Sequence, residues 1–484
     1  MKQTLVLAFC LTLVAAASLG QGCPPPPNLP IGSCAPKSGT ATNFVGDTGP
    51  LRVRKSIYML SAAEIAKLNL AFQKLRALPS TDPRRWLAQA NVHCWNCSGD
   101  NSTVADVHGT WAFMPWHRVY LYVLEKTLGQ LVNDPSFAIP YWDWNTPDSG
   151  TCTGHLHVPP PYLGGGTSNA LFDCYRVVSA TSTMNVNSVG AARVNSILTL
   201  NNTFALFFGS PSGSAALWPG PHGYVHLFVG NSPNTNIAKQ DMGVLETAAR
   251  DPLFWAHHAN IDRLWDVWIA QHGTPAYPPA FLSQSWTFWD QNQKLIRLSA
   301  DDAANRATRL RYQYAAPCST AAHAAGVAPE APGGEEEMVS ITPQPQTFRT
   351  TARPAARKFT IGASTGTHVV VNLEGVTVPA DQAAILRVYV NKPAATAETG
   401  AEDSNLVQEL FVVPSKTPGS GHDGHQHSFN FKIVLPESLA AEVEAAQGEV
   451  SVTIVPVAAT PAGALAAVPT AIDVKMKKPY VSVE

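Results

Sequence analysis

Hydrophobic residues recur at helical spacing in three long segments of the chain. In the first of them, Leu68, Phe72 and Leu75 lie three or four positions apart. Such spacing places apolar side chains on one face of a helix. We therefore expect amphipathic helices over residues 61–78, 111–131 and 252–271.

The C-terminal part of the chain has a different pattern. Short runs of apolar and β-branched residues, several of them alternating with polar residues, are separated by turn residues. This pattern is typical of strands in an antiparallel sheet. The expected strands cover residues 358–361, 368–373, 385–390, 410–413, 429–434 and 450–457.

A stretch of distinct composition separates the two patterns. From Ala315 to Pro354 the chain is rich in Ala, Pro, Gly, Glu and Thr, as solvated linkers are. The predicted fold class is a mainly α domain, a helical bundle, followed by a small antiparallel β-sandwich or barrel. The expected divisions are a leader at 1–20, the helical domain at 21–315, a flexible linker at 316–354 and the β-domain at 355–484.

The leader has the features of a secretory signal peptide. Lys2 precedes an apolar run from Leu5 to Ala17, and small residues then lead to Gly20. The run is too short to span a membrane, and no later stretch reaches about 18 apolar residues. We therefore expect no membrane partner and a secreted protein, or one elsewhere in the secretory route (extracellular, vacuolar or periplasmic).

Charge and composition exclude several classes of protein. The 33 basic and 35 acidic residues give a formal net charge of −2, so a basic surface for nucleic acid is not expected. The chain contains 12 Trp, 18 Phe and 12 Tyr, too many large apolar side chains for a disordered protein. A globular protein without a nucleic-acid partner is therefore predicted.

The cysteine count is odd once the leader is removed. Of eight cysteines, Cys10 leaves with the leader and seven remain. Seven cannot all pair with one another, so one thiol is expected to take part in other chemistry. The seven are Cys23, Cys34, Cys94, Cys97, Cys152, Cys174 and Cys318.

Histidines form the densest candidate site of the helical part. His222 and His226 are four residues apart, so on a helix their imidazoles share a face and can bind one metal ion. Six histidines in two groups of three suggest a pair of three-nitrogen sites, which suit Zn, Cu, Fe or Ni. Spacing alone does not choose among these metals, and a core-packing role for any single histidine stays open. The six are His93, His108, His117, His222, His226 and His258.

Two carboxylates and a seventh histidine stand close to these positions. Glu125 lies eight residues after His117, and Asp262 lies four residues after His258. A carboxylate so placed can orient a ligand ring or neutralise a neighbouring cation. His257 precedes His258, and adjacent helical residues point about 100° apart, so both are not expected to face one metal ion.

Two longer motifs contain several of these histidines. The first, His-x4-Phe-x-x-Trp-His-Arg with a later Glu, runs from His108 to Glu125. The second, Asp-Pro-x-Phe-x3-His-x3-Asp, runs from Asp251 to Asp262. With these motifs and segments such as 387–391, the chain resembles the type-3 copper proteins over nearly its whole mature length. The resemblance is specifically to plant-type polyphenol oxidases, the catechol oxidases and tyrosinases.

The resemblance implies two copper ions per chain. It places three histidines on each copper, and these six are the implied catalytic residues. His257, Glu125 and Asp262 are implied to lie beside the ligands without binding copper. The implied ligands are His93, His108 and His117 for the first copper and His222, His226 and His258 for the second.

The resemblance also implies a use for the odd cysteine. In the family, the cysteine four residues after the first ligand forms a thioether with the second ligand; here these are Cys97 and His108. An ordinary disulfide is the alternative for Cys97. Cys94 is implied to pair with an N-terminal cysteine, where the family usually has two adjacent ones and this chain has Cys34. The disulfide candidates are Cys23, Cys34, Cys94, Cys152, Cys174 and Cys318.

The implied reaction is the oxidation of small phenolic substrates by O2. An o-diphenol loses two electrons and two protons and leaves as an o-quinone, while O2 is reduced to water. Trp218 stands where the family has a Glu, and Gly223 stands where active hydroxylases often have an Asn. Leu245 stands where a Phe often overhangs the copper. These substrate-entrance residues favour diphenol oxidation with weak monophenol activity, and core packing is the alternative for Trp218 and Leu245.

The C-terminal domain and the linker imply a latent enzyme. In the family this domain shields the active site, so a protease that cuts the linker is an expected partner. Tyr312 and Tyr314 resemble the Tyr-x-Tyr pair that closes the family's catalytic domain. Arg52 or Arg54 is the expected cation–π partner of that pair.

Other functions than diphenol oxidation are open to a chain with these histidines. A tyrosinase with full monophenol hydroxylase activity uses the same centre, and so does a haemocyanin-like O2-binding protein. An O2 carrier must exclude phenols permanently, whereas a proenzyme excludes them with a domain on a cleavable linker, so the linker favours the enzyme. A structural zinc protein is disfavoured, because paired CxxC ligands are missing from the sequence.

Overall fold

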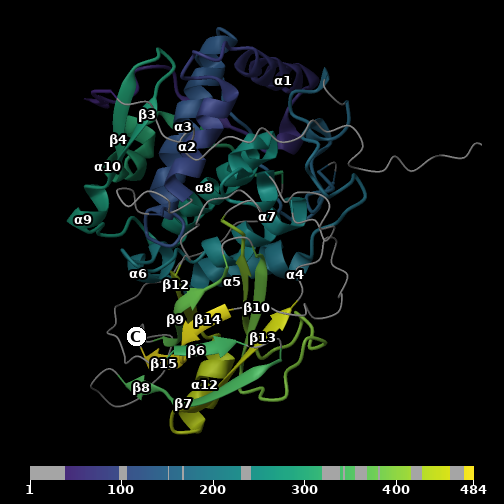
Figure 1. Ribbon diagram of the computed structural model, residues 1–484, viewed down its shortest axis with the longest axis vertical. Coiled ribbons are helices and arrows are strands. Elements are labelled where there is room, and N and C mark those ends of the chain that lie inside the picture. The colour runs from purple at the N-terminus through teal and green to yellow at the C-terminus, as the bar shows by residue number, and fades with distance from the viewer. Residues whose placement is uncertain are drawn as a thin grey trace, which may run out of the picture.

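The protein divides into a helical part and a β-rich part, seen at the top and bottom of the computed structural model in Figure 1. This arrangement confirms the predicted fold class. The leader at 1–20 and the strand expected at 358–361 lie outside the described residues. The structure describes residues 39–97, 106–150, 152–165, 168–230, 241–318, 338–341, 344–354, 368–379, 382–415, 428–457 and 474–483.

Long helices form at all three predicted segments. The first, α1 (Ala62–Arg76), begins at Ser61, which forms a capping box with Glu64. The central helix, α3 (Phe113–Leu131), buries nearly all of its side chains, as expected for a helix surrounded by others. The third, α8 (Pro252–His272), begins at Asp251, whose side chain accepts a hydrogen bond from the Leu253 N–H.

Shorter helices complete the helical part. One further helix of 12 residues, α2 (Trp86–Cys97), packs beside α1 and the turn η7. The short helices are α4 (Val186–Val189), α5 (Ala191–Leu200), α6 (Phe204–Phe208), α7 (Gly223–Gly230), α9 (Pro279–Leu282), α10 (Ala300–Ala304) and α11 (Arg306–Arg309). Four short 3-10 helices and one π-helical turn are also present among the described residues. The 3-10 helices are η2 (Ile57–Met59), η3 (Pro160–Tyr162), η6 (Asp241–Gly243) and η7 (Ala248–Arg250), and the π-helical turn is η5 (Trp218–His222).

Two small sheets tie distant parts of the helical region together. One has the order β1-β4-β3, and the other pairs β2 with β5 in parallel. Because β2 precedes the helices and β5 follows them, this pairing joins the two ends of the helical part. The strands are β1 (Thr42–Asn43), β2 (Arg52–Arg54), β3 (Ser285–Trp289), β4 (Leu295–Ser299) and β5 (Tyr312–Tyr314).

A buried charge network lies where β2 and β5 meet the central helices. Arg54 Nε donates to Glu125 on α3 at 2.7 Å, and its Nη1 donates to Asp262 on α8 at 3.1 Å. The hydroxyls of Tyr312 and Tyr314 both donate to Asp262 at 2.5 Å. The Arg54 guanidinium also lies 3.7 Å from the centre of the Tyr312 ring, so Arg54 occupies the cation–π position that the sequence offered to Arg52 or Arg54.

We expect Asp262→Ala to destabilise the protein strongly. Burial alone would raise the pKa of Asp262, but Arg118 and Arg54 hold that pKa below its usual value, so the carboxylate is charged. Its removal leaves Arg54 and Arg118 buried without their partner, a change that costs about 3–5 kcal/mol. Urea denaturation measures the cost. Asp134→Ala is the control, because Asp134 pairs with Lys67 at the surface and such pairs contribute under about 1 kcal/mol.

Two sheets and one helix form the C-terminal part. The first sheet is antiparallel with the order β11-β10-β13-β7; the second has the order β6-β14-β9-β15-β8, with β12 on β9. Only the β15–β8 pairing among the described strands of this part is parallel. The elements are β6 (Met338–Ile341), β7 (Gln346–Thr351), β8 (Arg353–Pro354), β9 (Val369–Thr377), β10 (Ala384–Val390), β11 (Leu406–Val412), β12 (Ser428–Val434), α12 (Glu437–Ala445), β13 (Glu449–Val457), β14 (Val474–Lys477) and β15 (Tyr480–Val483).

The predicted linker at 316–354 was wrong for its C-terminal portion. Strands β6, β7 and β8 lie inside it, and β7 pairs with β13 from Gln346 to Thr351. The side chains of β7 alternate between half-buried and exposed, because β7 is an edge strand of its sheet. Its polar, threonine-rich composition therefore resembles that of a linker, while its backbone completes a sheet.

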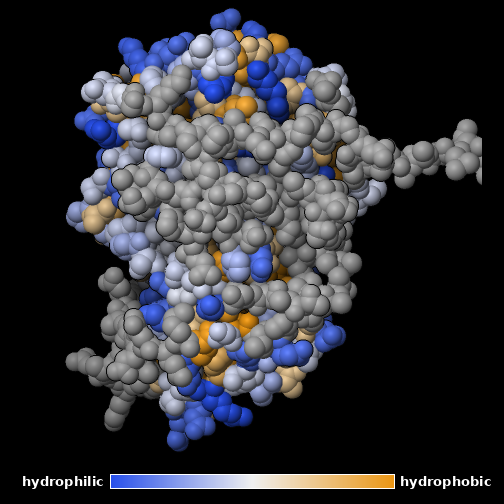
Figure 2. Space-filling view, viewed as in Figure 1, coloured by the Kyte–Doolittle hydropathy of each residue, from blue (hydrophilic) through white to orange (hydrophobic). Residues whose placement is uncertain are grey.

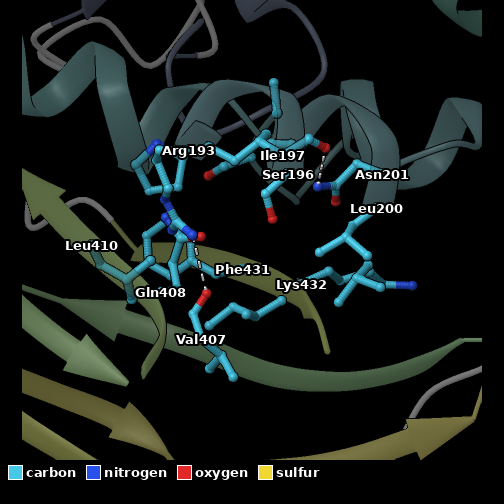
Figure 3. Close-up of a pocket in the computed structure, with 16 residues that line it drawn as sticks. Arg193, Ser196, Ile197, Leu200, Asn201, Val407, Gln408, Leu410, Phe431 and Lys432 are labelled. Atoms are coloured by element: carbon cyan, nitrogen blue, oxygen red, sulfur yellow. Dashed lines mark hydrogen bonds between the residues drawn. The ribbon is translucent and has the colours of Figure 1, made fainter. Parts of the chain in front are cut away.

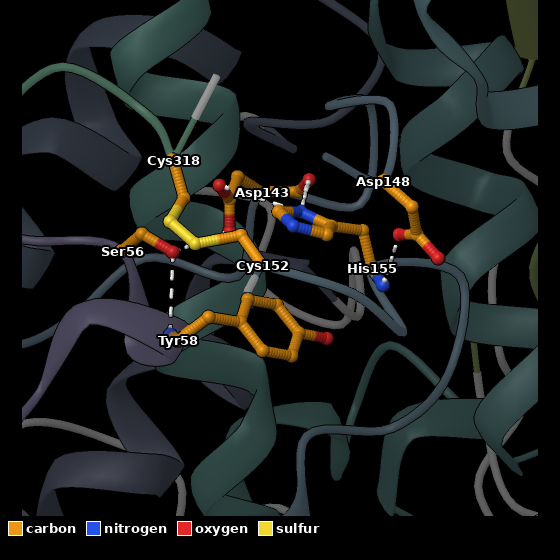
Figure 4. The surroundings of a disulfide bond; sticks show 7 residues. All are labelled: Ser56, Tyr58, Asp143, Asp148, Cys152, His155 and Cys318. Atoms are coloured by element: carbon orange, nitrogen blue, oxygen red, sulfur yellow. Dashed lines mark hydrogen bonds and ion pairs between the residues drawn. A yellow bond between two sulfur atoms is a disulfide. The ribbon is translucent and has the colours of Figure 1, made fainter. Parts of the chain in front are cut away.

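A disulfide fastens the end of the helical part to its body. Cys318 lies four residues after β5 and is bonded to Cys152, with the two Cα atoms 5.8 Å apart. Figure 4 shows the buried polar group beside this bond: Ser56 Oγ donates to Asp143 at 2.7 Å, and Asp143 also lies against His155. Two further candidates, Cys94 and Cys174, are also disulfide-bonded.

The two parts of the chain meet along α5 and the strands β11 and β12. Figure 3 shows the residues of α5 facing those strands across a cavity of about 30 Å³, roughly the space for one water molecule. Arg193 on α5 points toward Val407, and Ser188 on α4 donates to Glu409 Oε2 at 2.8 Å. This junction therefore combines close packing with hydrogen bonds.

Polar residues cover much of the described surface. On the face shown in Figure 2, they lie over both ends of the molecule, while hydrophobic residues are visible in the lower half, over the C-terminal strands. Among the helices of the described residues, none has the length and apolar character needed to cross a membrane.

Candidate metal centre

The six predicted ligand histidines converge from six segments of the helical part. Three come from α2, α3 and the loop before α3, and three come from η5, α7 and α8. Each side chain is at most 2% exposed, which places the whole cluster inside the fold. The segments carry His93 (α2), His108 (loop), His117 (α3), His222 (η5), His226 (α7) and His258 (α8).

The histidines fall into two groups. In each group the candidate ligand atoms lie within 4.8 Å of one another. The two groups are adjacent, since the rings of His117 and His258 stack with centroids 4.2 Å apart. The groups are His93, His108 and His117 on one side and His222, His226, His257 and His258 on the other.

Hydrogen bonds to backbone carbonyls set the tautomer of most of these rings. A carbonyl oxygen only accepts, so a ring nitrogen that bonds to it must carry the proton, and the other nitrogen keeps its lone pair. The Nδ1 partners are Leu245 O for His93 (2.7 Å), Phe113 O for His117 (2.7 Å), Trp218 O for His222 (3.2 Å) and Met242 O for His226 (2.8 Å). For His108 the Nδ1 partner is the Asp106 carboxylate at 3.3 Å.

The candidate ligand nitrogens of these rings lie close together, and several of the Nε2 atoms have no hydrogen-bond partner among the described residues. Nε2 of His93, His117 and His222 has no hydrogen-bond partner in the described part of the chain. The Nε2 atoms of His226 and His258 lie 3.4 Å apart. Buried nitrogens with free lone pairs are costly unless a ligand uses them, so the cluster fits bound metal.

The donor set selects among metals. All the candidate donors are neutral imidazole nitrogens, which suit Cu, Zn, Fe and Ni and disfavour Mg, Ca and Mn. The two carboxylates predicted beside the ligands bind cations instead: Glu125 binds Arg52 and Arg54, and Asp262 binds Arg54 and Arg118. These carboxylates therefore neutralise cations behind the site and do not orient the ligand rings.

Burial keeps the cluster uncharged. It lowers the pKa of His93, His117, His222 and His258 well below 6.5, with a further contribution from neighbouring histidines. Burial likewise lowers the pKa of His226 to about 3. At neutral pH the rings are therefore free of the proton that would compete with a metal.

The metal-free protein is expected to lose stability as the pH falls below about 6.5. In that range the histidines of the unfolded chain bind protons, whereas those of the folded cluster stay unprotonated. Each such histidine therefore lowers the free energy of unfolding by up to about 1.4 kcal/mol per pH unit of acidification. Asp173, whose pKa burial raises to about 6, acts in the opposite direction. Urea denaturation at pH 7.5, 6.5 and 5.5 measures the net effect, and a flat or rising stability on acidification would contradict it.

The predicted entrance residues lie at the junction with the C-terminal part. Trp218 is buried, and its ring packs on Phe429 with centroids 4.6 Å apart. The Leu245 N–H donates to Pro414 O at 2.8 Å, while its carbonyl holds His93. Gly223 begins α7 directly after His222. Leu245 and Trp218 therefore support ligand rings through their carbonyls as well as packing at the junction.

His257 departs from the simple helical expectation. It was predicted to face away from the metal held by His258, yet one of its ring nitrogens belongs to the same close group. An imidazole extends sideways from its Cα, so neighbouring side chains on α8 can converge on one point. Its Nδ1 accepts a hydrogen bond from Trp144 Nε1 at 3.1 Å.

Several supporting groups were not predicted. The carbonyls of Leu245 and Met242 come from the segment between α7 and α8, and Phe254 packs on His258 with centroids 4.1 Å apart. Phe254 stands in the second motif, so its role beside the site could have been predicted from the sequence. The role of a backbone carbonyl could not, because every residue has one.

The thioether remains a prediction. Cys97 is the last residue of α2, and its side chain lies outside what the structure describes. His108, its predicted partner, is fully buried in the first group. Mapping of reduced peptides tests the link, since the Cys97 and His108 peptides should stay joined.

Comparison with known proteins identifies relatives across the helical part. The model of the common central domain of tyrosinase matches residues 83–170 and 166–271. Polyphenol oxidase A1 of Vicia faba is 32% identical over 290 residues, 55% of this chain and 47% of that protein. Aureusidin synthase of Antirrhinum majus is 32% identical over 61% of this chain and 57% of its own. The chain thus spans about half the length of these curated relatives.

Solved structures extend the likeness to most of the chain. Latent apple tyrosinase superposes with a TM-score of 0.72 and 25% identity, covering 92% of this chain and 100% of that one. The polyphenol oxidase of Vitis vinifera (Grenache) covers 61% of this chain and 93% of its own at 29% identity and a TM-score of 0.52. A functional unit of octopus hemocyanin shares the fold at 16% identity and a TM-score of 0.51, covering 89% of this chain and 99% of its own.

Proposed function

The chain belongs to the type-3 copper proteins of the tyrosinase and plant polyphenol oxidase kind, and on that premise we propose that it is a latent o-diphenol oxidase. It would use O2 as the electron acceptor and hold two copper ions per chain. The observation that carries the proposal is the pair of buried histidine groups, in each of which the candidate ligand nitrogens lie within 4.8 Å of one another; Nε2 of His93, His117 and His222 has no hydrogen-bond partner among the described residues.

The protein's part in the reaction is to hold and enclose the metals. His93, His108 and His117 would bind the first copper, and His222, His226 and His258 the second. When bound, copper supplies the electron transfer between the diphenol and O2. Backbone carbonyls fix four of the six rings in the tautomer that binds, and the surrounding aromatic side chains exclude water.

The residues at the entrance support a preference for diphenols. Monophenol hydroxylation needs a base for the phenol proton, and Trp218 occupies the position where the family has a Glu. Gly223 adds no polar side chain next to His222. We therefore assign catechols as the main substrates, with slow action on monophenols; a tyrosinase with full hydroxylase activity is the alternative.

The C-terminal part is proposed to be the shield that makes the enzyme latent. A Cβ atom on Gly223 would lie 2.3 Å from the Phe411 carbonyl oxygen, so β11 rests directly on the residue after a copper ligand. On the other side, Phe429 of β12 lies against Trp218 and the backbone of Gly109. Both neighbours of the site are therefore covered by the same part of the chain.

A haemocyanin-like O2 carrier is the competing function. The octopus hemocyanin unit shares this fold, so the fold alone does not separate the two. What favours the enzyme is that the covering strands come from a part of the chain joined through residues 319–337 alone, where an activating protease would cut. Binding of O2 without any turnover of catechol, before and after trimming, would support the carrier.

The cellular route is also a proposal. The signal-like leader and the Cys152–Cys318 disulfide favour an oxidising compartment reached by export. This covers a secreted, vacuolar, periplasmic or thylakoid-lumen location.

Substrate range tests the proposed activity. The copper-loaded, trimmed protein is expected to oxidise small catechols rapidly and to act on tyramine slowly and after a lag. O2 consumption measured with each substrate gives the ratio of the two rates. Equal rates without a lag would show a full tyrosinase, and no turnover of either phenol would refute the oxidase.

A further inference from the structure

His257 would be a ready fourth ligand if position alone decided. One of its ring nitrogens lies within 4.8 Å of the ligand nitrogens of His222, His226 and His258. Its ring is fully buried and stacks on that of His222, with centroids 5.4 Å apart and planes 23° apart. Something other than distance must therefore decide whether it binds metal.

Trp144 determines the tautomer of His257. The Trp144 Nε1–H donates to His257 Nδ1 at 3.1 Å, and both side chains are fully buried. Because an indole N–H can only donate, Nδ1 must be unprotonated, and the proton of the neutral ring sits on Nε2. Neither nitrogen then has a free lone pair: Nδ1 uses its own for Trp144, and Nε2 carries hydrogen.

The ligand histidines have the opposite arrangement. Nδ1 of His93, His117 and His226 donates to a backbone carbonyl at 2.7–2.8 Å, which leaves the Nε2 lone pair free. Nδ1 of His222 faces the Trp218 carbonyl at 3.2 Å. In these four rings the hydrogen bond on Nδ1 leaves the Nε2 lone pair available for a metal, whereas the hydrogen bond on Nδ1 of His257 does not.

Trp144 is itself held firmly. Trp142, two residues before Trp144, donates its backbone N–H to Ala256 O at 2.9 Å. Ala256 directly precedes His257 on α8, so this bond fixes the segment of Trp144 against the helix at that level. The segment of Trp144 thus lies against α8 at the level of His257, where the indole N–H meets the ring.

We propose that Trp144 is a positioning residue that keeps His257 from coordinating the second metal, so that this metal has three nitrogen ligands. A catalytic metal needs an open position for its reactants, and a fourth imidazole would occupy it. The inference rests on the proposed dicopper centre and concerns its second site.

The test is Trp144→Phe, which removes the N–H and keeps an aromatic ring. It is made in a His117→Ala background, loaded with Cu(II), so that the second site holds the copper and can be observed by electron paramagnetic resonance. We expect the number of coupled nitrogens to rise from three to four. In the chain with both sites intact, turnover should fall about 10–100-fold, as is typical when an outer hydrogen bond is lost.

Two variants identify the cause. Trp142→Phe is the matched control, because Trp142 is also fully buried but donates its indole N–H to His155 O at 3.1 Å; it should leave three nitrogens. Adding His257→Ala to Trp144→Phe should restore three nitrogens. An unchanged count in Trp144→Phe, or a fourth nitrogen that survives the loss of His257, would overturn the inference.

His257→Ala alone decides the question if Trp144→Phe does not fold. In the His117→Ala background three nitrogens should remain, and in the chain with both sites intact two copper ions should bind, because His257 contributes no lone pair. Loss of a nitrogen in this variant would show that His257 is a ligand and overturn the inference alone. Failure of the unmodified chain to bind copper would overturn the proposed function and, with it, this inference.

Discussion

His117→Ala is expected to reduce the bound copper from two ions to one per chain and to abolish nearly all diphenol oxidase activity. His117 lies on the rigid, buried helix α3, and its Nδ1–H is held by the Phe113 carbonyl at 2.7 Å. Among the described residues, its group contains only His93 and His108 besides itself, so no further side chain of that group can replace it. The loss should exceed the 10–100-fold typical of changes around a ligand, and metal analysis with O2 consumption measures both effects.

His155→Ala is the matched control for that experiment. His155 is equally buried, but it lies beside Asp143 and the Cys152–Cys318 disulfide (Figure 4) and belongs to neither histidine group. It should keep two copper ions and most of the activity, even if the protein becomes less stable. Full activity of His117→Ala with one copper would refute the assignment of the first site.

Removal of the C-terminal part is expected to raise diphenol oxidase activity several-fold or more. Strands β11 and β12 cover the residues next to His222 and His108, and attachment to the same chain keeps their effective concentration near the millimolar range. The sequence suggested a cut between Ala315 and Pro354. Because β6, β7 and β8 are paired in sheets, cleavage between Cys318 and Met338 is now the expected route. Activity before and after limited proteolysis, with the cut mapped by mass spectrometry, measures the gain.

Gly223→Ala should reproduce part of this gain without a protease. Its Cβ would lie 2.3 Å from the Phe411 carbonyl oxygen, so β11 must move away. Gly223 has helical backbone angles, which alanine adopts readily. The ratio of trimmed to full-length activity should therefore fall toward one in this variant. Equal activity of trimmed and untrimmed protein in the unmodified chain would mean that the C-terminal part is no shield.

The helices were predictable because burial imposes a period on the sequence. The segment 111–131 became α3 (Phe113–Leu131), and 252–271 became α8 (Pro252–His272). The strand β7 was missed, since an edge strand with one solvent-facing side needs few apolar residues. Its pairing with β13, about a hundred residues away, is a long-range contact that local composition does not record.

The candidate site, too, was predictable from the sequence only in part. The ligand histidines stand in motifs of distinctive spacing, so the sequence alone brought all six forward. The carbonyls of Leu245 and Met242 and the indole of Trp144 determine which ring nitrogen is free, and these contacts exist only in the folded chain. Local helix geometry also misjudged His257, because side-chain reach and not only backbone direction decides what meets a metal.

The Cys152–Cys318 disulfide would hold the end of the helical part in place after the proposed cut. A cut after Cys318 creates a new chain end, and a free end beside β5 would tend to peel away and take Tyr312 and Tyr314 from Asp262. The bond closes a loop with a sequence separation of 166, which restricts the unfolded chain by about 5 kcal/mol in the chain-entropy account. It also remains within the trimmed enzyme. If proteolysis removes the C-terminal part as proposed, this bond would hold the end of the helical part in place and so preserve the contacts of Tyr312 and Tyr314 with Asp262.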